Sequence, residues 1–223
     1  MTNTSITPDK VATRRRLKAL GIQALEEGGW KVTAAGLGKS SMRKISKDGL
    51  DKLATIRTSQ DTWIAFPRNE NDTGWATLDQ ADIVVAASVD QGADSRWLQV
   101  HIIDADEMRD RFDRAYAARK RAGYQIDKGR GVWISLYEDD SEHPVTLVGA
   151  GAGTAHEAVL RVPFSAASDV ETPFEPEPSG ASLDWEIPPP SEALPQLTIA
   201  QAKAALARAL GVDESAIKIS IEA

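Results

Sequence analysis

The chain has 223 residues, with 26 Lys and Arg, 33 Asp and Glu, a formal net charge of -7 and no cysteine. This length can bury one sizeable core, and the lack of cysteine excludes a disulfide framework and a thiolate zinc site. The start of the chain lacks the apolar run of a signal peptide, and no stretch approaches the roughly 20 apolar residues of a membrane span. We therefore expect a cytoplasmic protein with no membrane partner.

The charge is distributed unevenly along the chain. Residues 1–60 carry 12 Lys and Arg against 5 Asp and Glu, whereas residues 61–164 carry 11 against 18. Residues 165–196 hold seven acids and no Lys or Arg, so the charge of this segment equals the net charge of the whole chain. We predict a basic-fronted α/β core domain at 1–164, an acidic Pro-rich linker at 165–196 and a helix-strand tail at 197–223.

The first helix is predicted to begin after Thr7, because Pro8 and Asp9 follow in the order that helix starts favour. Apolar residues then recur at helical spacing up to a Gly28-Gly29 stop. This stripe contains Leu17, Leu20, Ala24 and Leu25. Four cations lie mainly off it, namely Arg14, Arg15, Arg16 and Lys18.

Extended structure is predicted from residue 30, followed by a hairpin with strands at residues 42–46 and 50–57. Its turn contains Asp48-Gly49, a pair that tolerates the positive φ values of tight turns. Residues 81–89 are apolar enough for a central strand, which we expect beside a strand at residues 97–103. Further strands are predicted at residues 63–66, 132–137 and 145–148, with Trp63 in the core.

A second helix is predicted from Asp104 to about Gly123, because Asp104 and Glu107 have the spacing of a capping box. Its buried stripe is expected to contain Met108, Phe112, Ala115 and Tyr116. The Arg and Lys residues on its other faces are interpreted as a solvated surface. Their expected local partners are Asp106, Asp110 and Asp113.

Four segments carry a family resemblance: LEEGGWKV (25–32), LATIRTSQDTWIAF (53–66), ADIVVAASV (81–89) and WLQVHIIDADEM (97–108). Their order of helix, strand, hairpin, short strand, apolar strand, strand and helix resembles the restriction-endonuclease-like (PD-(D/E)XK) superfamily over residues 8–122. The resemblance implies a mixed central sheet flanked by helices.

In that superfamily an Asp on one hairpin strand and a Glu-x-Lys on the next hold a divalent metal, which activates the attacking water. The Glu-x-Lys positions fall here on Thr55-Ile56-Arg57, and residues 42–46 contain no aspartate. Because arginine does not readily act as a base, we expect no catalytic residue, no metal site and no cofactor. In the alternative of displaced ligands, an Mg²⁺-dependent nuclease would use Asp48, Asp51 or Asp61, although turns and strand ends attract aspartate for local reasons.

A polar cluster follows the apolar strand, at the place where the resemblance implies contacts with nucleic-acid phosphates. The cluster is Arg57, Thr58, Ser59 and Gln60. Arginine and hydroxyl donors suit phosphate oxygens, so we predict a nucleic-acid-binding site that joins this cluster to the four cations of the first helix. Ordinary strand-end caps are the plainer alternative. We expect Arg57→Ala to weaken nucleic-acid binding without unfolding the protein.

Two other patterns predict no site. Residues 149–153, Gly-Ala-Gly-Ala-Gly, lack the spacing of a dinucleotide-binding fingerprint and are expected to form a flexible turn. His101, His143 and His156 share no metal-ligand spacing, and His101 is expected to be a hydrogen-bonded histidine within the sheet.

The linker allows two interpretations, a solvated spacer or an acidic strip that covers a basic face or docks on a partner. Its expected anchors are Phe174 and Trp185. In the tail, Ile217, Ile219 and Ile221 alternate with polar residues and predict a strand. This strand is expected to dock on the core, on a second copy or on another protein.

Three functions remain open at this point. The first is a non-catalytic nuclease-like protein that binds nucleic acid or a partner protein in a DNA-associated system, such as bacterial defence or a mobile element. The second is an interaction or assembly protein with no nucleic-acid role, which uses the linker and tail. The third is the nuclease with displaced ligands.

Overall fold

The computed structural model describes residues 8–36, 41–90, 95–127 and 129–164, which all belong to one compact unit, Asn3–Glu186. The predicted linker and tail lie outside these ranges. So do the partner-binding residues predicted there, Phe174, Trp185, Ile217, Ile219 and Ile221. None of the helices that the structure describes is long and apolar enough to cross a membrane.

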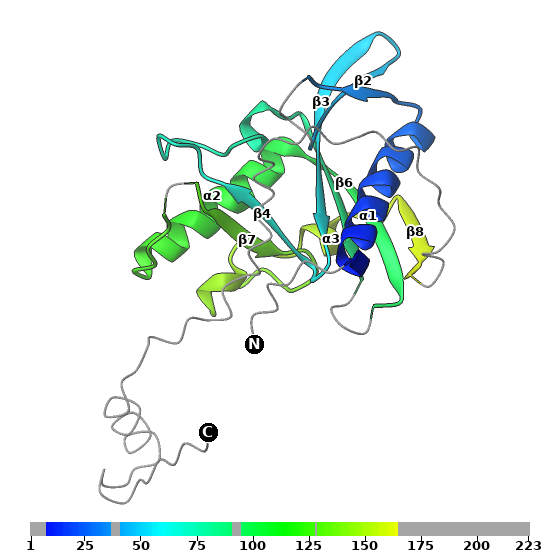
Figure 1. Cartoon of the computed structure of the whole chain (residues 1–223). Helices are drawn as coiled ribbons and strands as arrows, with labels where there is room; N and C mark the ends of the chain where they lie inside the picture. The colour runs from blue at the N-terminus through cyan, green and yellow to red at the C-terminus, as the bar shows by residue number, and fades with distance from the viewer. Residues whose placement is uncertain (1–7, 37–40, 91–94, 128, 165–223) are drawn as a thin grey trace, which may run out of the picture. The chain divides into compact units, whose positions relative to one another are not determined.

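The described residues form a mixed α/β fold around a six-stranded sheet with the order β1-β2-β3-β5-β6-β8 (Figure 1). The strands are β1 (Lys31–Ala34), β2 (Met42–Lys47), β3 (Leu50–Ser59), β5 (Ile83–Val89), β6 (Trp97–Asp104) and β8 (Leu160–Pro163). β3 and β5 run parallel, and all other neighbours are antiparallel. Every residue of β5 is buried, which confirms the prediction of a central strand.

Helix α1 (Pro8–Glu27) covers one face of this sheet (Figure 1). The predicted stripe is confirmed, since Leu17, Leu20, Ala24 and Leu25 are buried. Gly21 allows the helix to lie close to β3 and β5. A Cβ atom at this position would come within 3.0 Å of Ile56 Cγ2 and 3.3 Å of Val85 Cγ1, so a larger residue would push α1 away from the sheet.

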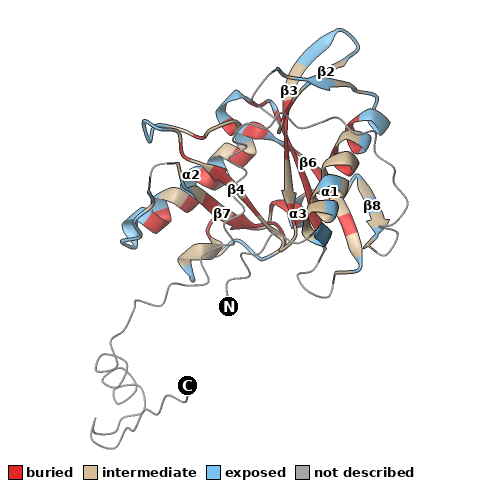
Figure 2. Ribbon diagram, viewed as in Figure 1, coloured by how far each residue is buried: buried red, intermediate tan, exposed pale blue. Residues whose placement is uncertain are grey.

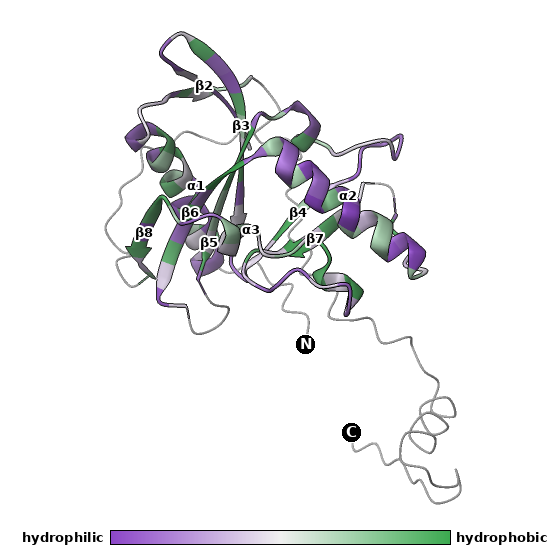
Figure 3. Ribbon diagram, turned by 180° about the vertical axis from the view of Figure 1, so that it is seen from behind, coloured by the Kyte–Doolittle hydropathy of each residue, from purple (hydrophilic) through white to green (hydrophobic). Residues whose placement is uncertain are grey.

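Helix α2 (Ala105–Arg121) and a small antiparallel sheet of β4 (Trp63–Pro67) and β7 (Gly131–Ser135) cover the opposite face. The core of this layer is aromatic, because the ring of Phe112 lies 5.1 Å from Phe66 and 5.3 Å from Trp75, centroid to centroid. Seen from behind, α2 alternates hydrophilic and hydrophobic residues (Figure 3), as an amphipathic helix does. The buried residues concentrate between the layers (Figure 2).

Two turns have the geometry that the sequence predicts. The amide of Trp30 donates to the carbonyl of Leu25 at 3.0 Å across Gly29, whose φ is 83°. In the β2–β3 hairpin, Asp48 and Gly49 have φ values of 50° and 80°, as a two-residue turn with positive φ at both positions requires. These local signals therefore place the end of α1 and the hairpin.

Several predictions near the end of the core are wrong. Residues 145–148 do not form a strand, because the chain turns after Pro144 into a 3-10 helix, η2 (Val145–Leu147), stabilised by local amide-to-carbonyl bonds. The glycine-rich turn leads into a short helix, α3 (Ala152–Ala155), whose first two residues are buried.

Other parts of the structure also differ from the sequence-based expectations. Strand β8 and a second 3-10 helix, η1 (Leu78–Gln80), have no counterpart among the predicted elements. Trp63 is only partly buried, whereas the core residues of β4 are Ile64 and Phe66.

Candidate functional site

Polar side chains line the face of the main sheet that α2 covers, near the ends of β3 and β5. Ser59 and Ser88 are neighbours in the parallel pairing of these strands, and His101 of β6 lies opposite Ala86. Because side chains alternate along a strand, Arg57 and Ser59 lie on one face of β3. Ser59, Ser88 and His101 are all buried. The sheet thus changes from an apolar to a polar surface beneath the α2 layer.

The two positions that the resemblance assigns to Glu and Lys point into the interior. Thr55 lies opposite Met42, is fully buried, and has no hydrogen-bond partner for its Oγ1 among the described residues. The guanidinium of Arg57 lies 4.3 Å from the ring centroid of Phe66 and donates to Thr77 Oγ1 at 2.5 Å. A neutral hydroxyl therefore stands in place of the carboxylate, and Arg57 contributes to packing between β3 and β4.

The aspartates considered as displaced ligands lie at opposite ends of β3. Asp48 forms the hairpin turn, and Asp51 pairs with Lys44 at 3.4 Å. Asp61 accepts a hydrogen bond from Ser59 Oγ at 2.9 Å, beyond the other end of the strand. A strand of this length, 10 residues, spans roughly 30 Å. In the described ranges, no three His, Asp or Glu residues form a group that could hold a metal ion.

The predicted cluster after the apolar strand is divided between two faces of β3. Arg57 and Ser59 face the α2 layer, whereas Thr58 faces α1, on the same side as the buried Ile56. Gln60 follows the strand, and its Nε2 donates to the backbone carbonyl of Lys10 at 2.7 Å. The structure therefore brings Gln60, and not Arg57, to the first turns of α1.

The four predicted cations of α1 have different surroundings. Arg15 is exposed, and Arg14 and Lys18 are partly buried. Arg16 donates from Nη1 and Nη2 to two backbone carbonyls at the end of β8, at 3.1 and 3.2 Å. Arg16 thus ties β8 to α1, while Arg15 presents its guanidinium to solvent.

A chain of hydrogen bonds within the polar face had no signal in the sequence. The hydroxyl oxygen of Tyr137 lies 2.7 Å from Ser88 Oγ and 3.1 Å from His101 Nε2. His101 Nδ1 lies 2.8 Å from the carbonyl oxygen of His156. Because a carbonyl can only accept, Nδ1 carries a proton, and in the neutral imidazole Nε2 accepts from Tyr137. Ser88 Oγ donates its single proton to the carbonyl of Val89 at 2.9 Å, so it offers the Tyr137 hydroxyl a second acceptor beside His101 Nε2.

Burial keeps both titratable members of this chain neutral. It lowers the pKa of His101, whose hydrogen bond to the His156 carbonyl acts in the opposite direction, and it raises the pKa of Tyr137. The expectation of a buried, hydrogen-bonded His101 is confirmed. The chain links β5, β6, the segment after β7 and the segment after α3, which indicates a role in holding these elements together.

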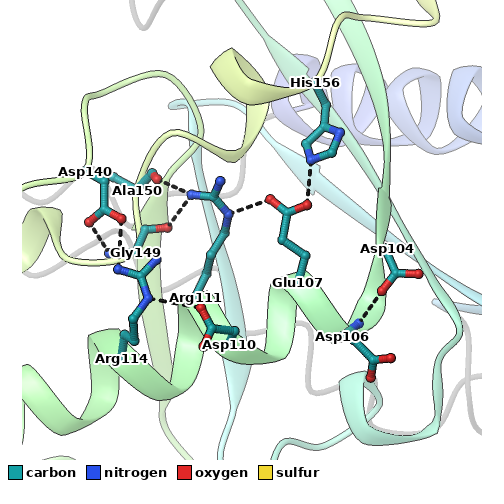
Figure 4. Close-up of polar contacts among 10 residues, drawn as sticks. All are labelled: Asp104, Asp106, Glu107, Asp110, Arg111, Arg114, Asp140, Gly149, Ala150 and His156. Carbon is teal, nitrogen blue, oxygen red and sulfur yellow. Dashed lines mark hydrogen bonds and ion pairs between the residues drawn. The ribbon is translucent and has the colours of Figure 1, made fainter.

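A second polar network joins the start of α2 to α3 and is drawn in Figure 4. Glu107 binds His156 Nε2 at 2.7 Å and Arg111 Nε at 2.8 Å. Arg111 Nη1 in turn donates to the carbonyl of Ala150 at 2.5 Å. Burial acts to raise the pKa of Glu107, but the hydrogen bonds from Arg111 and His156 outweigh it and lower that pKa.

The predicted capping box at the start of α2 is half right. Asp104 is the N-cap, and its Oδ1 accepts from the amide of Asp106 at 2.8 Å (Figure 4). Glu107 does not reach back to the N-cap, because Arg111 and His156 bind both of its carboxylate oxygens. Glu107 therefore connects helices instead of capping one.

The other charged residues of α2 pair locally, as the sequence predicts for two of three acids. Asp106 pairs with Arg109, and Asp110 pairs with Arg114 at 3.1 Å. The third acid, Asp113, accepts instead from the indole Nε1 of a loop tryptophan at 2.8 Å. Most of this helix surface is therefore occupied by ion pairs within the protein.

Two buried arginines stabilise the α2 layer. Arg68 lies between the rings of Trp75 and Tyr116, 4.6 and 4.4 Å from their centroids. Arg119 donates to backbone carbonyls in β7 and η2 at 2.6 and 3.0 Å, and burial lowers its pKa to about 10. Both residues are buried, with 7% of their surface exposed, and their hydrogen bonds hold neighbouring segments against α2.

Comparison with known proteins returned nothing. No protein-family model, no curated protein and no solved structure matches the chain. The function of the chain is therefore inferred from its own residues. Two features stand out in the described ranges: an amide and several cations at the start of α1, which suit an anionic ligand, and the buried polar chain around His101, which is closed within the fold.

Proposed function

We propose that this chain is a nuclease-like protein that binds nucleic acid without cleaving it. The contact surface is the first half of α1 together with the end of β3. The observation that carries the proposal is the hydrogen bond from Gln60 to the Lys10 carbonyl, at 2.7 Å. It holds the polar end of β3 against the part of the chain with the highest density of cations.

The order of elements supports the choice of scaffold. The succession α1, β1, β2, β3, β4, β5, β6, α2 has the order on which the resemblance to the restriction-endonuclease-like superfamily rests. The hairpin of β2 and β3 lies beside the central β5, and a helix covers each face of the sheet. A scaffold of this kind can present one helix and one strand end to a nucleic-acid backbone.

The surroundings of Thr55 and Arg57 support binding without cleavage. Metal-dependent hydrolysis needs carboxylates to hold the metal and a group that positions or activates water. At the corresponding positions the chain has a neutral, fully buried threonine and an arginine that packs on Phe66. Arginine remains protonated at neutral pH, so it is poorly suited to accept a proton.

Charge supports the choice of α1. Residues 10–25, the basic segment, contain five Lys and Arg and no Asp or Glu. Arg15 lies on the exposed face of the helix, and Gln60 adds an amide beside its first turns. Cations on one surface attract phosphates and release condensed counterions, which gives affinity without base recognition.

The proposal is tested by fluorescence anisotropy of labelled double- and single-stranded DNA with the full chain. If about four phosphates are neutralised, affinity should fall roughly a hundredfold between about 50 and 200 mM salt. Arg15→Glu should weaken binding and reduce the slope of log affinity against log salt by about one. Arg121→Glu, at an exposed position in the last turn of α2, is the matched control and should bind as the unmodified chain does.

Two results would contradict the proposal. One is the absence of binding to either form of DNA at the lower salt concentration. The other is an equal loss of affinity in Arg15→Glu and Arg121→Glu, because charge alone, without a defined surface, would then account for binding. Cleavage of DNA in the presence of Mg²⁺ would favour the nuclease with displaced ligands instead.

A further inference from the structure

The described chain ends against the basic segment of α1. Arg16 donates from Nη1 to the carbonyl of Phe164 at 3.1 Å and from Nη2 to the carbonyl of Pro163 at 3.2 Å. The amide of Phe164 also binds the carbonyl of Arg96 at 2.8 Å, and its ring packs in the same cluster as Leu17 and Leu20 of α1. The last described residue, Phe164, therefore lies beside the middle of this helix.

The residues that follow have the charge opposite to that of the helix. Residues 165–186, the acidic segment, contain six Asp and Glu and no Lys or Arg. The basic segment, residues 10–25, contains five Lys and Arg and no Asp or Glu. The acids are Asp169, Glu171, Glu175, Glu177, Asp184 and Glu186. A polyanion is therefore tethered next to a polycation.

The tether is long enough for the two segments to meet. An extended Pro-rich chain covers about 3.1 Å per residue, so Glu171 can lie up to about 22 Å from Phe164. Along a helix, the basic segment of 16 residues spans about 24 Å, with Arg16 near its centre. A short tether holds two sites at an effective concentration in the millimolar range, at which even weak ion pairing becomes favourable.

We propose that the acidic segment docks on the basic segment of α1 and competes there with nucleic acid. The consequence for nucleic acid rests on the proposed function, whereas the docking itself does not. The occupant is this segment of the same chain and not a partner, for two reasons. The described chain ends beside Arg16, and the negative charge of the segment is opposite to the positive charge of the helix. A phosphate backbone then has to displace carboxylates from the same cations, so docking weakens binding.

Docking is measured directly with a nitroxide spin label attached through Ser179→Cys, which gives a unique thiol because the chain has no cysteine. In the full chain at about 50 mM salt, where charges are weakly screened, the label should broaden amide signals of α1, and salt should reverse this. The control carries the same label after the six acids are changed to Asn or Gln. Broadening that is absent from the first protein, or equal in both, overturns the proposal.

The effect on binding is measured with a short DNA duplex and the same neutralised variant without the label. If docking occupies α1 in nine molecules of ten, the unmodified chain binds about tenfold more weakly than the variant at low salt. The difference should shrink as salt screens the ion pairs. Equal affinities of the two proteins for the duplex overturn the competition.

The two measurements separate this proposal from the proposed function. Reversible broadening together with no DNA binding by either protein supports the docking and overturns the nucleic-acid function. DNA binding without broadening overturns the docking and leaves the nucleic-acid function in place.

Discussion

The hydroxyl oxygen of Tyr137 lies 3.1 Å from Nε2 of His101, although 36 positions separate the two residues in the sequence. Gly153 makes room for this contact. A Cβ atom at residue 153 would lie 2.6 Å from Tyr137 Cε1 and 3.0 Å from the carbonyl oxygen of Leu136. The start of α3 therefore fixes the phenol ring in the place where it can join the imidazole to the hydroxyl of Ser88.

Tyr137→Phe should lower the free energy of unfolding by about 1–3 kcal/mol, as measured by urea denaturation. The substitution keeps the ring but removes the hydroxyl group, which lies within hydrogen-bond distance of both His101 Nε2 and Ser88 Oγ. Both partners are buried, so each is left without this hydrogen bond. Tyr124→Phe is the control, because Tyr124 is 42% exposed and should change stability by less than about 0.5 kcal/mol. Equal stability of both variants would contradict a structural role for the chain of hydrogen bonds around His101.

His101 should remain neutral at pH values where an exposed histidine is protonated. Its pKa in the folded state lies below the ordinary value of 6.5, mainly because of burial. At pH above 6.5 neither the folded nor the unfolded state binds this proton. As pH falls below 6.5 the unfolded state takes up the proton first, so stability decreases until the folded-state pKa is passed.

Nitrogen-15 NMR of the imidazole tests this directly. The expected spectrum at neutral pH shows a protonated Nδ1 and an unprotonated Nε2, with a titration midpoint below 6.5. A midpoint above 6.5, or the opposite tautomer, contradicts the hydrogen-bond directions assigned here.

Glu107→Gln should destabilise the protein by about 1 kcal/mol at neutral pH, since Glu107 is partly exposed and solvent weakens its ion pairs. The pKa of Glu107 is lowered in the folded state. Its contribution is therefore complete above about pH 4.5 and is lost as pH falls through the folded-state pKa. Thermal unfolding at several pH values should show the variant and the unmodified chain converging in acid. Glu157→Gln, at an exposed position, is the control, and a pH-independent difference for Glu107→Gln would contradict the account.

Arg57→Ala should destabilise the protein by about 1–3 kcal/mol in urea. The guanidinium stacks on Phe66 and binds Thr77, and both contacts are lost in the variant. Arg15→Ala should leave stability within about 0.5 kcal/mol, because Arg15 is exposed. A loss of nucleic-acid affinity in Arg57→Ala is evidence for direct contact only where the folded fraction is unchanged. Unchanged stability in Arg57→Ala would show that the stacking contributes little.

The elements with strong local signals are predictable from the sequence. The stripe of α1, the apolar run of β5, the Asp-Gly turn and the N-cap at Asp104 all depend on residues close together in the chain. Strand β8 has only four residues, so its alternation of partly buried and exposed positions is too short to identify a strand from the sequence. The run at residues 145–148 is apolar but short, and a 3-10 turn after Pro144 satisfies its amides equally well.

The site is less predictable than the fold, because its contacts join distant segments. Alternation along β3 sends Arg57 and Thr58 to opposite faces, so a cluster in sequence is divided in space. The pairing of Glu107 with His156 spans 49 positions and depends on where α3 lies. Only the basic start of α1 and its proximity to the strand end at Gln60 connect the sequence pattern with a surface.

The DNA-binding surface proposed on α1 is tested by mapping the DNA contact on the protein. A short duplex is titrated into the nitrogen-15-labelled full chain at about 50 mM salt, and shifts of the backbone amides are followed by NMR. We expect the largest shifts in residues 10–18 of α1 and near Gln60, and we expect them to reverse at high salt. Shifts centred on α2 or on the β2–β3 hairpin, or no shifts at all, would contradict it.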